Sequence, residues 1–491
     1  MTAPFTTETG TSVPPSVPFR PVYTGIIAFV AALGGLLFGY DWVVIGGAKP
    51  FYEVYFNLPA SPHADALIGW ATSCALVGCL IGSGIAGAFS DRLGRRPVLI
   101  ASAILFAVSS ILTGWAHTFP SFVLWRIAGG VAIGLASNVS PVYISEISPA
   151  HWRGRLVSLN QLALVVGILL AQVVDWRISL HNADPSLALA SWPVQYGWRW
   201  MFTAVAFPAV VFLLTALFVP ESPRWLIARN RSEAARSVLT RLADGAYAAA
   251  EIARVQASIA AESQQARASV SELFSSALRR PLLIGICLAV LQQWCGINVL
   301  FNYAQEVYRD AGYGVADILF NIVISGTINL LFTLFAMALV DRIGRRSLML
   351  FGCLGVGIAH LMVALSYYLH LRGLPVLVFT LAAIACYAMS LAPVTWVLIS
   401  EIFPNRIRGL GVSAAVSSLW AASFVLVYTF PIMERLLGSS GTFVGYGIVC
   451  IAGFFFVRTT VPETRNQTLE EIQGTFSNYE RRSKNRPHSA A

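Results

Sequence analysis

The sequence predicts an all-α membrane protein with twelve transmembrane helices, arranged as two pseudo-symmetric halves of six helices with a helical linker between them. Hydrophobic residues make up 56% of the 491 residues and charged residues only 12%, whereas about a quarter of a soluble domain is charged. Apolar runs of roughly 20 residues, the length that spans a bilayer, recur along the chain, and two motifs occur once in each half. So few charges exclude a chain of soluble domains, because a soluble surface needs more of them.

Twelve apolar segments are long enough to cross a bilayer. We expect them to be helices, because in hydrocarbon each backbone N–H and C=O must bond within its own segment. Their predicted spans, in order, are 22–47, 66–89, 97–116, 119–143, 155–177, 198–219, 281–308, 315–340, 347–370, 374–402, 408–432 and 442–461. Glycine and alanine are frequent in them, as at Gly129 and Gly130. Small residues of this kind allow close helix packing in lipid.

Three polar segments flank or join these runs. Residues 1–21 form a Thr- and Pro-rich tail that lacks the positive start of a signal peptide and is expected to be disordered. Residues 220–280 are predicted to be a cytoplasmic linker with short amphipathic helices, such as Ser232–Leu242. Residues 462–491 form a basic cytoplasmic tail. The six-helix halves are then 22–219 and 281–461.

The net charge of +9 reflects topology rather than nucleic-acid binding. Most of the 33 Lys and Arg residues lie in the two tails and in alternate loops, which is the positive-inside pattern. This pattern predicts a multi-pass protein of a cell membrane, plasma or bacterial inner, with both termini in the cytoplasm. The seven cysteines lie in apolar runs without metal-ligand spacing. With no P-loop and no Gly-x-Ser-x-Gly motif, we expect no metal, no cofactor and no enzyme.

Two loop motifs are repeated between the halves. DRLGRR at 91–96 recurs as DRIGRR at 341–346, and SEISP at 145–149 recurs as SEIFP at 400–404, each copy of the latter followed by an Arg-Gly pair. Each motif follows the same-numbered helix of its half. Parallel repeats about an axis normal to the membrane are a known design of transporters.

Amide and aromatic side chains inside the predicted helices mark a candidate binding site, because polar groups are costly in lipid. A sugar offers hydroxyls that both donate and accept, which amides can match, and a C–H face that an aromatic ring can cover. In a straight helix Gln293 and Asn298 would point about 140° apart. They can converge only if the helix breaks, and Gly296 between them favours a break.

Four longer motifs resemble those of the sugar porter family of the major facilitator superfamily, over roughly residues 23–472. They are GLLFGYD at 35–41, PESPRWL at 220–226, QQ-x-x-G-x-N at 292–298 and PET at 462–464. The resemblance is greatest to bacterial xylose–proton symporters and facilitative glucose transporters. It implies the major facilitator fold and transport of a monosaccharide, a pentose or a hexose, by alternating access. We expect the chain to function as a monomer in the lipid bilayer.

By this resemblance, one set of positions is expected to contact sugar, with Tyr303 as a gate: Phe38, Gln161, Gln292, Gln293, Asn298, Asn329, Tyr303, Trp396 and Trp420. A second set of loop charges would form a cytoplasmic gate, which holds while the site opens outward and parts when it opens inward: Asp91, Arg95, Glu146, Arg153, Glu221, Asp341, Arg345, Glu401, Arg408 and Glu463. The alternative for these charges is simple control of topology.

Asp41 and Arg126 are the expected proton-coupling residues. Asp41 lies inside the first span, where an ionised carboxylate needs a partner or takes up a proton. Arg126 is the one strongly basic residue in the middle of a predicted span. Symporters of the family carry Asp at the position of Asp41, and facilitators carry Asn. The resemblance therefore implies sugar–proton symport, with a permanent structural ion pair as the alternative.

Several alternatives stay open on the sequence. Leu419, Gln305, Ile168 and Val205 depart from the pattern of the xylose symporters, so the sugar is not defined. Facilitated diffusion is the nearest rival, and Asp41 discriminates it from symport. A sensor of the same fold would carry longer signalling tails, and a drug antiporter would not need the amide cluster.

Overall fold

The computed structural model describes residues 19–149, 151–181, 188–264, 270–403 and 407–463, and these residues form helices and short connections without a strand. Eleven of their helical segments are long and apolar enough to cross a membrane. The last, Arg408–Thr460, contains two spans, because Gly438 in its middle has a non-helical backbone (φ 68°, ψ 169°). The predicted twelve spans are thereby confirmed.

The first half runs from α1 to α7. Its sixth span, Pro193–Ala216, is assembled from three consecutive pieces, η2, α6 and α7. The elements of this half are α1 (Pro21–Tyr55), η1 (Leu58–Ala60), α2 (Ala64–Leu93), α3 (Arg95–Gly114), α4 (Phe119–Ile147), α5 (Arg153–Ser179), η2 (Pro193–Gly197), α6 (Trp198–Ala204) and α7 (Ala206–Ala216).

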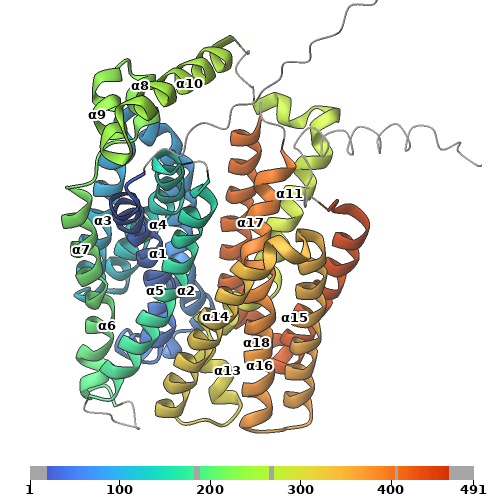
Figure 1. Ribbon diagram of the computed structural model, residues 1–491. Helices are drawn as coiled ribbons and strands as arrows, with labels where there is room; N and C mark the ends of the chain where they lie inside the picture. The colour runs from blue at the N-terminus through green and yellow to red at the C-terminus, as the bar shows by residue number, and fades with distance from the viewer. Residues whose placement is uncertain (1–18, 150, 182–187, 265–269, 404–406, 464–491) are drawn as a thin grey trace, which may run out of the picture.

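The linker and the second half follow. The linker holds α8 (Pro223–Ala228), α9 (Ser232–Leu242), α10 (Gly245–Gln264) and η3 (Val270–Phe274). The second half holds α11 (Ser276–Trp294), α12 (Ile297–Asn302), α13 (Ala304–Asp310), α14 (Val315–Ile343), α15 (Arg345–Tyr368), α16 (Leu374–Met389), α17 (Leu391–Ile402) and α18 (Arg408–Thr460). The two bundles stand side by side, with α8–α10 at one end (Figure 1). We call this end the linker side and the opposite end the far side.

Matching glycines end matching helices in the two halves. Gly94 separates α2 from α3 with φ +106°, and Gly344 separates α14 from α15 with φ +98°. This backbone region is open to glycine and strained for other residues. The repeated loop motif therefore makes the same sharp turn in each half.

Close helix contact in the first half depends on glycine residues, which have no side chain. A Cβ on Gly130 of α4 would overlap the Ala75 carbonyl and lie 3.0 Å from the Gly78 Cα of α2. In lipid, helices associate through such packing rather than through the hydrophobic effect. The α2–α4 pair can thus approach to backbone contact.

Both ends of the first helix differ from the prediction. α1 continues past residue 47 to Tyr55, which places Lys49 inside the helix with 1% exposure. At its start, Phe19 packs against the Tyr247 ring with centroids 4.7 Å apart, and the Arg20 N–H donates to the Leu242 carbonyl at 2.9 Å. These two residues belong to the packed structure rather than to the tail. Residues 1–18 and 464–491 of the two tails lie outside the described residues.

We expect Gly130→Ala to lower the thermal midpoint of the detergent-solubilised protein by several degrees, because overpacking costs about 1–3 kcal/mol. Gly84→Ala is the matched control, since a Cβ there meets no atom within 4 Å. Equal midpoints for the two variants would refute the role assigned to this contact.

Candidate functional site

The seventh span breaks where the sequence predicts it. Gly296 has φ +83°, so α11 ends at Trp294 and α12 begins at Ile297. A Cβ on Gly296 would lie 2.7 Å from the Tyr446 ring, so glycine is required for space as well as for conformation. The Cys295 carbonyl, freed by the break, bonds the His360 Nε2 at 2.8 Å.

The break brings three amides together. The Gln293 Nε2 donates to the Gln292 Oε1 at 2.9 Å. The Asn298 Nδ2 donates to the Gln293 Oε1 and, at 3.5 Å, to the Ser423 Oγ of α18. All three amides are at least 93% buried, with exposures of 3%, 6% and 7%. These amides bond to one another in this structure, and they can exchange these hydrogen bonds for bonds to the hydroxyl groups of a ligand at little cost in free energy.

Aromatic side chains lie where the two halves meet. The ring centroids of Phe38 and Trp42, both on α1, lie 5.8 Å and 6.0 Å from the ring centroid of Trp420 on α18. Trp420 is 2% exposed, and its indole N–H has no partner among the described residues. Trp396 of α17 is 36% exposed. Tyr303, between α12 and α13, is fully buried, and its hydroxyl donates to the Val427 carbonyl at 2.7 Å.

The remaining predicted sugar contacts make no described hydrogen bond to the amide cluster. Asn329 is 4% exposed in α14, and Gln161 is half-buried in α5. None of the hydrogen bonds described for the structure joins Gln161, Asn329 or Trp396 to Gln293 or Asn298.

Asp41 and Arg126 form an enclosed ion pair, each 3% exposed. The Arg126 Nη1 lies 2.9 Å and 3.0 Å from the two Asp41 carboxylate oxygens, and its Nη2 is 3.5 Å from the Asp41 carbonyl. The guanidinium carbon lies 5.3 Å from the centre of the Phe202 ring. Burial on this scale makes each charge depend on the other, because an unpaired charge in such surroundings is strongly unfavourable.

The repeated loop charges of the first half pair within that half. The Arg95 Nε and Nη2 donate to the two Glu146 carboxylate oxygens at 3.0 Å and 3.1 Å, and Nη1 lies 3.1 Å from Asp91. Glu221 accepts the backbone N–H groups of Arg95 and Arg96 at 2.9 Å and 3.3 Å. The Arg153 Nε donates to the Ser145 carbonyl, also within this half.

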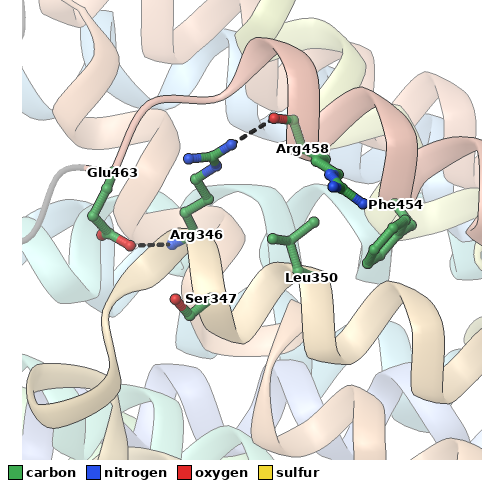
Figure 2. Close-up of a pocket in the computed structure, with 6 residues that line it drawn as sticks. All are labelled: Arg346, Ser347, Leu350, Phe454, Arg458 and Glu463. Carbon is green, nitrogen blue, oxygen red and sulfur yellow. Dashed lines mark hydrogen bonds between the residues drawn. The ribbon is translucent and has the colours of Figure 1, made fainter.

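The second half repeats the arrangement. Glu463 accepts the N–H groups of Arg345 and Arg346 at 3.0 Å and 3.1 Å, and the Arg345 Nη2 lies 3.8 Å from Glu401. Figure 2 shows the Arg346 guanidinium bonded to the Arg458 carbonyl, as Arg96 is bonded to the Leu217 carbonyl in the first half. Arg408 is half-buried, and the side chain of Asp341 lies outside the described residues.

The cavity in Figure 2 belongs to this loop structure. Its volume is about 470 Å³, and it is lined by Arg346, Ser347, Leu350, Phe454, Arg458 and Glu463. None of these residues contributes to the amide cluster, so the cavity is a feature of the loop.

Charges that the sequence did not single out join the two halves on the far side. Lys49 of α1 is bonded to Glu306 of α13, lies 3.7 Å from Glu53, and stands 3.7 Å above the Tyr303 ring. Arg435 of α18 lies 2.8 Å from Asp65 of α2. The predicted first span ends at residue 47, eight residues before α1 ends at Tyr55, so Lys49 falls outside the prediction. The sequence signal for this pair is a lysine flanked by apolar residues together with a glutamate in the seventh span.

The fold has twelve spans in two repeats, and buried amides lie around the break in the seventh span. These features define a secondary membrane transporter rather than an enzyme. The chain belongs to the family described as "Sugar (and other) transporter", whose model matches residues 27–476. It is 36% identical to the D-xylose-proton symporter of Escherichia coli K12 (93% of this chain, 96% of the relative). It is 35% identical to the arabinose-proton symporter of Bacillus subtilis (95% and 98%).

Solved structures agree in fold. The xylose transporter of E. coli in a partially occluded inward open conformation matches with a TM-score of 0.80 at 35% identity, covering 91% of this chain and all of that one. The same symporter bound to 6-bromo-6-deoxy-D-glucose matches with a TM-score of 0.77 at 35% identity, covering 93% and all of that chain. The predicted family, fold and transport class are confirmed.

We expect Arg126→Met to lower folding stability by about 3–5 kcal/mol, because it leaves Asp41 buried without its cation. The double variant Arg126→Met/Asp41→Asn should recover most of that loss, since no charge then remains. Thermal unfolding of the wild type, both single variants and the double variant completes the cycle. A double variant as unstable as Arg126→Met would argue against mutual dependence of the pair.

Proposed function

We propose that this protein carries a monosaccharide, a pentose or a hexose, across a cell membrane by alternating access, in symport with a proton. The observation that carries the proposal is the buried Asp41–Arg126 ion pair, in a chain whose other half holds a cluster of buried amides. The working unit is a single chain in the bilayer, with both termini and the linker side in the cytoplasm. Nucleic acid has no part in this function.

The amide cluster supports a sugar as the substrate. Gln292, Gln293 and Asn298 offer donors and acceptors that match hydroxyl groups, and Phe38 and Trp420 lie in contact near by. Relatives named for xylose, arabinose and glucose transport are each 35–36% identical to this chain. Gln161 of α5, Asn329 of α14 and Trp396 of α17 are proposed to contact the sugar as well, and Tyr303 is proposed as a gate.

Asp41 is proposed to bind the coupled proton. While ionised, the carboxylate holds Arg126 at 2.9 Å. A proton on Asp41 removes that attraction and leaves Arg126 free to find other acceptors. The two protonation states therefore favour different arrangements of α1 and α4, and a ligand that distinguishes two states shifts the balance between them.

The loop charges are proposed to form the cytoplasmic gate. In this structure the described pairs of Arg95 and Arg345 stay within one half, whereas Lys49 and Arg435 bridge the halves on the far side. With the linker side in the cytoplasm, this is an arrangement closed to the outside. On outward opening the two loops would approach and exchange partners across the halves. A set of ion pairs that exchange partners together can switch between two arrangements.

We expect Asn298→Ala to weaken sugar binding roughly tenfold, because one hydrogen bond to a hydroxyl and its geometry are lost. Asn138→Ala is the control, since the Asn138 amide donates to the Gly134 carbonyl of its own helix at 3.1 Å. Equilibrium binding is measured with the sugar taken up best from a panel of pentoses and hexoses. Unchanged affinity in Asn298→Ala would place the sugar elsewhere.

We expect Asp41→Asn to abolish sugar accumulation driven by a pH gradient while sugar counterflow continues. The amide cannot take up the coupled proton, but it still lets the two halves alternate. Uptake into proteoliposomes, with and without the gradient, separates the two activities. Accumulation that survives the change would eliminate Asp41 as the proton site, and a wild type indifferent to the gradient would indicate facilitated diffusion.

A further inference from the structure

A second carboxyl is buried in the first half, and none of the roles above uses it. Asp175, in the last turns of α5, is 2% exposed, and its Oδ1 has no hydrogen-bond partner among the described residues. The carboxyl lies against Gly47 of α1, where any Cβ would overlap it. No cation pairs with it among the described residues. A carboxylate enclosed in this way is far less stable than the neutral acid.

Asp175 lies directly behind the contact between the halves on the far side. Its neighbour in sequence, Trp176, packs on Phe320 of α14 with ring centroids 5.6 Å apart. One turn earlier, Gln172 abuts Gly326 of α14. On α1, the residue before Gly47 is Gly46, where a Cβ would lie 2.6 Å from the Phe301 carbonyl of α12. When the halves separate on this side, the contacts that seal Asp175 from water are the ones that open.

Gln172 is a second buried polar side chain of α5 behind the far-side contact between the halves. It is 3% exposed, and neither its Oε1 nor its Nε2 has a partner among the described residues. A buried amide with both ends unsatisfied is costly. Two adjacent turns of α5 thus carry polar groups that the closed state leaves without partners and that water would satisfy in an open one.

The charges around Asp175 do not neutralise it. Tyr40 on α1 lies within electrostatic range of Asp175, and its hydroxyl also has no partner among the described residues. Tyr52, also on α1, is fully buried, and its hydroxyl likewise has no hydrogen-bond partner among the described residues. The charged groups near the middle and far side of the helices packed on α5 have their own partners or are exposed: Arg126 binds Asp41, Lys49 binds Glu306 and Glu53, Arg199 donates to the carbonyls of Gly114 and Ala116, and Asp317 on α14 is exposed.

We propose that Asp175 is a second proton-binding carboxyl of this transporter, which must be protonated from the far side before the far side can close over it. The inference rests on the alternating-access function proposed above. In the open state the carboxylate takes a proton from extracellular water and forms an O–H bond. On reopening, the proton returns to the same water. Asp175 therefore carries no proton across the membrane, and the coupled proton stays with Asp41.

The sign of this effect follows from the charge of the buried group. Acid neutralises the Asp175 carboxyl, so low pH favours the closed far side and high pH favours the open one. Above the pH at which Asp175 loses its proton in the open state, each further pH unit should lower the ratio of closed to open molecules by up to about tenfold.

The test measures far-side opening directly and needs no sugar. Spin labels are placed at His63→Cys and Leu371→Cys, one on each half at the far side, with the exposed Cys287→Ser and with Asp41→Asn to silence the other carboxyl. Distance distributions from pulsed electron paramagnetic resonance are recorded from acidic to alkaline pH. We expect long distances to grow as the pH rises, and we expect the added Asp175→Asn to keep the short distance at every pH.

Controls make either result decisive. Asp175→Asn is nearly isosteric with the protonated acid, and Asp175→Ser provides a second neutral side chain if the first is poorly produced. Asp310→Asn removes a far-side carboxylate that bonds the Ser439 hydroxyl at 2.7 Å, and should leave the pH response intact. The proposal is overturned if the long distances still grow with pH in the Asp175 variants. Failure of the proposed function would show instead as wild-type protein that exchanges no sugar in counterflow.

Discussion

The absence of water between the two membrane surfaces is the constraint on which this structure depends. A polar group inside a span must find its partner within the protein. Arg126 and Asp41 do so through a close ion pair, and Gln292, Gln293 and Asn298 do so through one another. Each of these groups finds its partners in this state of the protein, and in the proposed function it exchanges them for a proton or a hydroxyl group. The same constraint that stabilises the fold therefore selects the groups that can respond to a ligand.

The two halves have kept their loops and changed their interiors. Glu221 and Glu463 accept the same pair of backbone N–H groups, and Gly94 and Gly344 make the same turn. The Asp41–Arg126 pair belongs to the first half and the broken helix at Gly296 to the second. One contact between the halves is made by Phe38 and Trp42 with Trp420, whose rings join α1 to α18.

The ion pairs on the two sides of the protein have different consequences. Pairs within a half, such as Arg95 with Glu146, move with that half as a body. Pairs between halves, such as Lys49 with Glu306, must break when the far side opens. Lys49 is also covered by the Tyr303 ring, at 3.7 Å, so the contact between the halves on the far side combines an ion pair, a cation–π contact and the packing of α5 against α14. Behind that surface lies Asp175, whose Oδ1 has no partner among the described residues, and the proposed sensitivity of closure to its charge follows from this burial.

The sequence by itself determined the class of fold, the number of spans, the repeat, and the break at Gly296, because these follow from hydropathy, period and local backbone preference. It also identified Asp41, Arg126 and the amides of the seventh span, since polar residues in apolar runs are conspicuous. Tertiary structure alone decided which groups meet. The pairing of Lys49 with Glu306, the isolation of Asp175 behind Gly47, and the docking of Phe19 on Tyr247 join residues distant in sequence or on adjoining helices. Hydropathy reports the cost of burying a charge, but only packing in three dimensions determines whether a partner lies within reach.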